Sequence, residues 1–298
     1  MNTLETLVDL IDRHTQRDGS HISPVPGLKL LRASSPSMSM PVIYEPTLCL
    51  IVQGVKQVCL GTKTFQYDTG NYLIASVELP VVGTVIEASS TEPYLCLQLD
   101  LDKRVLSDLA VRYPDHSIKA FVSPTGLALN RTTAALHNAA VRLAALLDTP
   151  EDIDALAPLI IQEILYRLLT EPGSSLIRQM AQADSRLNQI ARTIRWMRDH
   201  FHEPCRIEHA AKIAGMSRST FHLHFKAITT MSPIEFRTHL RMHEARRLMV
   251  SDGLDAASAG FRVGYESPSQ FSRDYVRLFG LPPTKHTGQL RELFNAAR

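Results

Sequence analysis

Short apolar runs alternate with turn residues through the first third of the chain. Gly54, Gly61, Gly70 and Gly83 separate several of these runs. Regularly spaced short strands with such turns favour an antiparallel sandwich or barrel. The predicted strands are Leu28–Leu31, Leu48–Val52, Gln57–Leu60, Phe65–Tyr67, Tyr72–Ser76, Val81–Ile86 and Tyr94–Leu99.

The spacing of apolar residues changes to a helical one after this region. It predicts helices over Leu101–Tyr113, Arg131–Leu147 and Ile153–Leu169, and a short helix over Leu176–Ala183 after the break at Glu171–Ser175. The third helix has the broadest apolar face. Such a face either packs entirely against the strands or exceeds what one neighbour covers, and we favour a dimer contact for part of it. The face consists of Leu156, Leu159, Ile160, Ile164 and Leu168.

Two segments near the C-terminus share one pattern, in which a small residue lies four positions before a glycine and a serine follows the glycine closely. The small residue lets two helices approach, the glycine forms the turn, and the serine caps the next helix. This is a helix-turn-helix pattern, and its repetition predicts two recognition helices in one chain. The residues are Ala211, Gly215 and Ser217 in the first unit, and Gly260, Gly264 and Ser267 in the second.

Aromatic residues occupy matching positions in the two units. Phe221 and Phe225 correspond to Phe271 and Tyr275, and this i, i+4 spacing places each pair on the buried side of its helix. The remaining positions face outward and are the candidate DNA contacts. They are Arg218, Ser219, His222 and Lys226 in the first helix, and Ser269, Gln270, Ser272 and Arg273 in the second.

The types of these side chains suit the major groove. Arginine and glutamine form bidentate hydrogen bonds with guanine and adenine, whereas Lys226 is better suited to phosphate. Gln270 has two alternative roles. It lies three residues after Ser267, so it either reads a base or closes a capping box at the start of its helix.

Charge is distributed unevenly over a chain whose formal net charge is only +2. Residues 185–298 hold 18 basic and 10 acidic side chains, whereas residues 1–184 hold 14 and 20. A basic segment joined to an acidic one indicates a nucleic-acid-binding module attached to a different domain.

The segment from about Arg186 to Arg291 resembles the DNA-binding domain of AraC/XylS-type transcription regulators. Besides the two motifs, Ser232–Phe236 and Arg241–Met249 resemble the long helix that links the two subdomains of that family, and Phe279–Pro283 resembles its closing signature. Ser232, Pro233 and Glu235 form a capping box with a favourable first helical residue.

The first unit departs from the family pattern at two positions. Leu223 stands where the family usually carries an arginine that meets the DNA backbone, and His224 stands where the stripe should be apolar. These departures predict a weaker first subdomain and a second subdomain that dominates specificity.

The stretch from about His21 to Asp102 resembles the N-terminal domain of one AraC-type subgroup, and Leu60–Leu73 is similar to the central hairpins of a cupin barrel. The expected fold class is therefore α+β, with an antiparallel cupin-like barrel, flanking helices and an all-α C-terminal domain. Small barrels enclose a pocket, which suits ligand sensing. The candidate polar wall for an effector consists of Tyr44, Gln53, Tyr67, Tyr72 and Tyr94.

Catalysis, metal binding and cofactor binding are not expected. The histidines before Asp184 lie off the predicted central strands, and first-row metals need several convergent ligands. The four cysteines have no metal-ligand spacing and are expected to be buried and reduced, with a redox or electrophile sensor as the alternative. The histidines are His14, His21, His116 and His137, and the cysteines are Cys49, Cys59, Cys96 and Cys205.

These patterns together predict a cytoplasmic, homodimeric transcription regulator, with no signal peptide or membrane span. Residues 1–182 would form the effector-binding and dimerisation domain, and 183–298 the DNA-binding domain. The resemblance implies double-stranded DNA, a small-molecule effector and RNA polymerase as partners. The alternatives are an effector-independent DNA-binding protein, which needs no pocket, and a cupin enzyme fused to a DNA-binding domain, which needs a metal.

Overall fold

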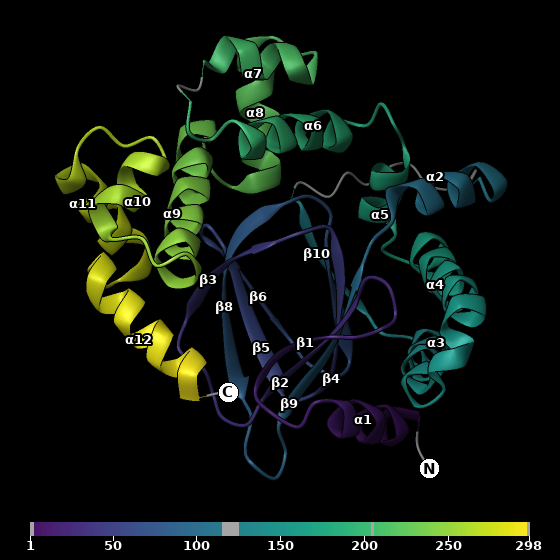
Figure 1. Cartoon of the computed structure of the whole chain (residues 1–298). Helices are drawn as coiled ribbons and strands as arrows, with labels where there is room; N and C mark the ends of the chain where they lie inside the picture. Colours follow the sequence, from purple (N-terminus) through teal and green to yellow (C-terminus); the bar gives the residue numbers. More distant parts are fainter. Residues whose placement is uncertain (1–2, 115–124, 204–205, 297–298) are drawn as a thin grey trace.

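Two β-sheets occupy the centre of the molecule, and helices surround them on most sides (Figure 1). The computed structural model describes residues 3–114, 125–203 and 206–296. His116 and Cys205, both considered above, lie outside the described residues. No helix within the described ranges is long and apolar enough to cross a membrane.

The strands form two antiparallel sheets, so the expected barrel is an open pair of sheets without continuous closure. The six-stranded sheet has the order β1-β2-β9-β4-β7-β10, and the four-stranded sheet has the order β3-β8-β5-β6. The strands are β1 Gly19–Ile22, β2 Leu28–Ala33, β3 Met40–Tyr44, β4 Thr47–Gln53, β5 Val55–Leu60, β6 Lys63–Tyr67, β7 Asn71–Ala75, β8 Leu79–Glu87, β9 Tyr94–Asp100 and β10 Leu127–Arg131.

The six-stranded sheet is covered on its outer face by helices of the same half of the chain. Helix α1 packs on β2, β4 and β9, and α3 packs on α1 and α4. Strand β4 is buried along nearly its whole length because helices cover one face and the second sheet faces the other. The helices are α1 Thr3–His14, α2 Lys103–Arg112, α3 Ala134–Ala145, α4 Ile153–Thr170 and α5 Ser175–Ala181.

All seven predicted strands and the four predicted helices of this half are present. Three strands, β1, β3 and β10, and helix α1 were not predicted. Each of these strands lies at the edge of its sheet and shows a half-buried or exposed pattern. An edge strand has one strand neighbour and does not need a continuous apolar run, so its sequence signal is weak.

The C-terminal half is entirely helical among its described residues. Two helix-turn-helix units, α7–α8 and α10–α11, lie on either side of the long helix α9 (Figure 1). Ser232 and Glu235 form the predicted capping box at the start of α9. The helices are α6 Arg186–Asp199, α7 Ile207–Ala214, α8 Arg218–Thr229, α9 Pro233–Ser251, α10 Ala256–Arg262, α11 Pro268–Phe279 and α12 Pro283–Ala296.

The two halves of the chain contact each other at several points around the sheets. Arg246 of α9 donates a hydrogen bond of 2.9 Å to the carbonyl of Pro41 in β3. Arg198 of α6 pairs with the largely buried Glu78 carboxylate at 2.6 Å. The main-chain N–H of Gly126 donates to the carbonyl of Ile228 in α8 at 2.8 Å. The C-terminal half is therefore held against both sheets.

Candidate DNA-binding and effector sites

The first helix-turn-helix unit has the predicted local geometry. Gly215 ends α7 in the left-handed conformation, with φ of 67°, and its N–H donates to the Ala211 carbonyl. The Ser217 hydroxyl accepts a hydrogen bond from the Thr220 N–H, which caps α8. A left-handed residue at this position favours glycine because other side chains are strained there.

The second unit repeats this construction with a closer helix contact. A Cβ atom on Gly260 would lie 2.9 Å from Cγ of Phe271, so only glycine allows α10 and α11 to approach this closely. Gly264 adopts a φ of 88° in the turn. The Ser267 hydroxyl accepts from the Gln270 N–H at 3.4 Å. Both predicted caps and both turn glycines are thus confirmed.

The four aromatic rings of the recognition helices are fully buried, as their spacing predicted. Phe221, Phe225, Phe271 and Tyr275 are each 0% exposed. Neighbouring rings on the same helix have centroids 5.3 and 5.6 Å apart, in tilted arrangements. These rings form the cores of the two subdomains, which fixes the opposite side of each helix as the outward one.

The candidate DNA contacts lie on the outward sides of α8 and α11. Arg218, Ser219 and Lys226 are exposed, and His222 is half-buried against Phe221. Ser269, Gln270 and Arg273 are exposed in α11, and Ser272 is half-buried. Arg218 is partly engaged by Glu208 at 3.1 Å, a pair in which both side chains are about two-thirds exposed. Such an exposed ion pair is weak, so a DNA phosphate could replace Glu208 as the partner of Arg218.

The two α11 side chains best suited to base reading have no partner in the part of the chain that the structure describes. Arg273 makes no ion pair or hydrogen bond there, and the Gln270 side chain makes no hydrogen bond. Only half of the capping box that was the alternative role for Gln270 is present. The Ser267 hydroxyl accepts from the Gln270 N–H, but the Gln270 side chain does not bond back to the Ser267 N–H. The Gln270 side chain is therefore available for contact with a base.

Leu223 and His224, the two residues of α8 that depart from the family pattern, lie in different environments. Leu223 is 67% exposed, a large apolar side chain on the surface of a recognition helix. His224 is half-buried, and burial, followed by the nearby Arg186, lowers its pKa. His224 is therefore accommodated in the packed side of the helix as a neutral ring.

Three of the five candidate effector residues converge between the sheets. The hydroxyls of Tyr44, Tyr67 and Tyr94 are buried and have no hydrogen-bond partner within the described ranges. The ammonium of Lys56, which the sequence did not indicate, lies 5.6 Å from the Tyr44 ring centre and 5.7 Å from that of Tyr94. Burial raises the pKa of all three phenols.

The other two candidates are placed elsewhere. Tyr72 is paired with Leu50 and Asn130, on the helix-covered face of the six-stranded sheet. Burial, followed by the charge of Glu171 just after α4, raises the pKa of Tyr72. Gln53 follows a bulge in β4 and donates to the Pro93 carbonyl at 2.8 Å. The structure does not bring either side chain to the tyrosine cluster.

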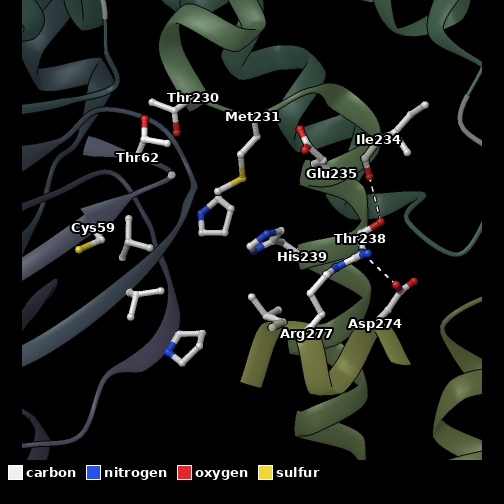
Figure 2. A pocket seen from close by; sticks show the side chains of 16 residues that line it. Cys59, Thr62, Thr230, Met231, Ile234, Glu235, Thr238, His239, Asp274 and Arg277 are labelled. Carbon is white, nitrogen blue, oxygen red and sulfur yellow. Dashed lines mark hydrogen bonds and ion pairs between the residues drawn. The ribbon is translucent and has the colours of Figure 1, made fainter. Parts of the chain in front are cut away.

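A cleft of about 650 Å³ separates the four-stranded sheet from the helical C-terminal half. Figure 2 shows Cys59 and Thr62 on the sheet side, facing Glu235 and His239 of α9 across the cleft. Cys59 is half-buried, whereas Cys49 and Cys96 are buried as expected. Among residues 3–114, 125–203 and 206–296, no group of three or more His, Cys, Asp or Glu side chains could hold a metal.

Comparison with known proteins identifies two regions. Residues 24–176 match the N-terminus of AraC-type transcriptional regulators, and residues 210–289 match a helix-turn-helix domain. Structures of ToxT from Vibrio cholerae share the fold. One has a TM-score of 0.57 over 87% of this chain and 96% of ToxT, at 11% identity. Another, bound to (E)-4-(8-methylnaphthalen-1-yl)but-3-enoic acid, has a TM-score of 0.59 over 88% and 98%, also at 11% identity.

Curated relatives match over a shorter region. The MmsAB operon regulatory protein of Pseudomonas aeruginosa is 32% identical over 97 residues, which cover 33% of this chain and 32% of that protein. The transcriptional activator RhaS of an Enterobacter species is 30% identical over 110 residues, or 37% and 38% of the two chains. The chain thus matches only about a third of the length of these relatives. The N-terminal match, which covers half of the sequence, and the helix-turn-helix match together show that the chain belongs to the AraC family of transcriptional regulators.

Proposed function

We propose that this regulator binds double-stranded DNA through both recognition helices and is controlled by a small molecule held between its two sheets. The observation that supports DNA binding best is the repeated unit. Each of α8 and α11 has a fully buried aromatic side and an outward polar side with at least one exposed basic residue. Two helices of this kind suit successive major grooves.

The division of the chain is part of the proposal. Residues 1–182 form the effector and dimerisation domain, and residues 183–298 the DNA-binding domain. The break between α5, which ends at Ala181, and α6, which begins at Arg186, supports this boundary. The wide apolar side of α4 leaves Leu156 and Leu159 exposed, by 42% and 63%, and supports a homodimer through this helix.

Control by a small molecule is supported by the unpartnered tyrosines between the sheets and by the direct contacts between the domains. ToxT, which shares the fold, has been solved with a carboxylic acid bound. An effector that shifts the sheets would alter the placement of the DNA-binding half, and with it promoter occupancy or contact with RNA polymerase.

The test is selection of genomic DNA with the full-length protein, followed by titration of a recovered site against salt. We expect a discrete site with protection in two successive major grooves, and loss of discrimination in Arg273→Ala. Arg112→Ala, in α2 far along the chain from the motifs, is the control. Diffuse binding with no preferred site, to the same degree in Arg273→Ala and Arg112→Ala, would contradict the proposal.

A further inference from the structure

The space between the sheets contains a polar cluster to which both sheets contribute. The four-stranded sheet supplies aromatic and basic side chains, and the six-stranded sheet supplies a tyrosine and two thiols. Lys56 and Tyr67 are directly opposite each other on β5 and β6, so both project to the same face. The members are Tyr44, Lys56, Tyr67, Cys49, Tyr94 and Cys96.

Lys56 extends along the interior because a glycine leaves room for it. A Cβ atom on Gly83 would lie 3.4 Å from Cε of Lys56 and 3.9 Å from its Nζ. The ammonium makes no ion pair with a described residue. The groups that act most strongly on it, after burial itself, are the phenol of Tyr44 and the thiols of Cys96 and Cys49, with no carboxylate among them. The contacts of this half-buried ammonium are therefore with aromatic rings and thiols, which leaves it able to pair with an anion.

The neighbouring thiols are the other groups that act on Lys56. The adjacent Cys96, followed by burial, raises the pKa of Cys49 well above its usual range. Cys49 lowers the pKa of Cys96, whose sulfur lies 3.6 Å from the Leu97 carbonyl oxygen. Neither residue is a carboxylate that would form a conventional ion pair with Lys56.

The interior thus holds polar groups without fixed partners beside a positive charge. Three tyrosine hydroxyls are buried without partners, and the Lys56 ammonium adds a positive charge. Apolar side chains complete the wall, since Val58 and Leu60 lie two and four residues after Lys56, on the same face of β5, and are 0% exposed. Buried donors are normally paired, so this arrangement indicates a ligand that supplies acceptors and negative charge together with an apolar body.

We propose that the cluster of Lys56, Tyr44, Tyr67 and Tyr94 binds a small organic carboxylate, with its carboxylate against Lys56 and its apolar part against Val58 and Leu60. This deepens the proposed function, on which it rests for its regulatory meaning. Tyr44 lies on β3, the strand whose Pro41 carbonyl binds Arg246, so the occupied site is connected to the long helix α9.

The test uses the full-length protein and three acids, benzoate, phenylacetate and hexanoate, each with its own amide as a neutral probe of similar shape. We expect at least one acid to raise Tm in a concentration-dependent way and to bind at least tenfold more tightly than its amide. Equal effects of acid and amide, or no effect of any acid, would overturn the proposal.

Variants assign the effect to the cluster. Lys56→Met should abolish the preference for acid over amide, because it removes the cation that the carboxylate would meet. Lys63→Met, which changes an exposed lysine on the adjacent strand β6, should leave the preference unchanged. A Lys56→Met protein that prefers the acid as the wild type does would refute the role of Lys56.

A second variant covers the case in which Lys56→Met does not fold. The double substitution Tyr67→Phe and Tyr94→Phe removes two unpartnered hydroxyls without changing the packing and should weaken acid binding at least tenfold; unchanged binding would overturn the proposal. DNA affinity is measured in the same samples. Acid binding that leaves DNA affinity unchanged would refute effector control while supporting the carboxylate site.

Discussion

The Arg246 guanidinium donates a hydrogen bond of 2.9 Å to the Pro41 carbonyl and so joins helix α9 to strand β3. The same guanidinium lies 5.0 Å from the centre of the Phe279 ring at the end of α11. One side chain of the linking helix α9 therefore contacts both the four-stranded sheet and the second recognition helix. A movement of β3 would act directly on the second subdomain through this residue.

Replacing Arg246 by methionine tests the importance of this contact. The aliphatic part of the side chain remains on Phe279, but the donor to Pro41 is lost. We expect the free energy of unfolding to fall by about 1.5–3 kcal/mol in urea denaturation, the range for a hydrogen bond from a charged group. Arg247→Met is the control, since Arg247 pairs with the exposed Asp252 and with Glu244 of its own helix and should cost at most about 1 kcal/mol. Equal losses in the two variants would argue against a specific role for Arg246.

The exposed Leu223 predicts a gain of DNA affinity on substitution. Leu223→Arg places a cation on the outward side of α8 and should tighten binding up to about fivefold, the range for an exposed charge pair. The slope of log affinity against log salt should become steeper by about 0.9 if the new side chain meets one phosphate. Fluorescence anisotropy over a salt series measures both quantities.

The control for this experiment is Ile22→Arg. Ile22 is 85% exposed in the edge strand β1, so the substitution adds the same charge outside the recognition helices. An identical increase in both variants would mean that the net charge, and not the position of residue 223, determines the effect.

The contact between Gly260 and Phe271 predicts that alanine in place of glycine lowers stability at residue 260 but not at residue 288. Gly260→Ala forces a Cβ atom to within 2.9 Å of a fully buried ring and should cost about 1–3 kcal/mol of stability. Gly288→Ala, in the exposed part of α12 with no atom within 4 Å, should instead gain up to about 1 kcal/mol because alanine favours a helix. Chemical denaturation measures both, and a neutral Gly260→Ala would show that α10 and α11 can separate without cost.

Buried His243 predicts a loss of stability in weak acid. Burial, followed by the charge of Arg246 and by His239, lowers the pKa of His243 to about 3, against an ordinary value of 6.5. The unfolded chain therefore binds a proton below pH 6.5 that the folded chain does not, and stability falls as the pH drops from 6.5 towards 3. Between pH 7.5 and 5.5 this residue should account for a loss of about 1.4 kcal/mol.

His243→Asn isolates this contribution from that of other histidines, such as His286, whose pKa is also lowered by burial and by Arg246. The difference in unfolding free energy between wild type and variant should change with pH by the stated amount. Parallel stability curves for the two proteins would contradict the assignment to His243.

The exposed apolar side of α4 predicts a dimer that a single charge disrupts. Leu159→Glu should raise the dimer dissociation constant at least tenfold, since burial of an unpaired carboxylate costs several kcal/mol. Sedimentation over a concentration series measures this constant, with Ile22→Glu as the control for added charge at an exposed apolar position. A monomeric wild-type protein would rule out the interface altogether.

The local parts of this protein could be predicted from the order of residues alone. The caps at Ser217, Ser232 and Ser267 and the turn at Gly215 arise from contacts within a few positions along the chain, and the spacing of the aromatic rings places each pair on one side of its helix. Hydrogen bonds to N–H groups three residues away and i, i+4 side-chain pairs depend on little else, so their sequence pattern is sufficient.

Which side chains point into the space between the two sheets was decided by the tertiary structure. Tyr67 and Tyr72 look alike in sequence, yet Tyr67 points between the sheets and Tyr72 towards the helices, because their strands pair with different partners. Nothing in the sequence indicated that Lys56 would point between the sheets. Its position follows from its pairing with Tyr67 and from the room left by Gly83. The face that a strand turns inward depends on pairings with distant segments, and a shift of one residue reverses it. Distant pairing therefore settled which side chains meet in the candidate effector site, whereas the DNA-binding helices were already specified locally.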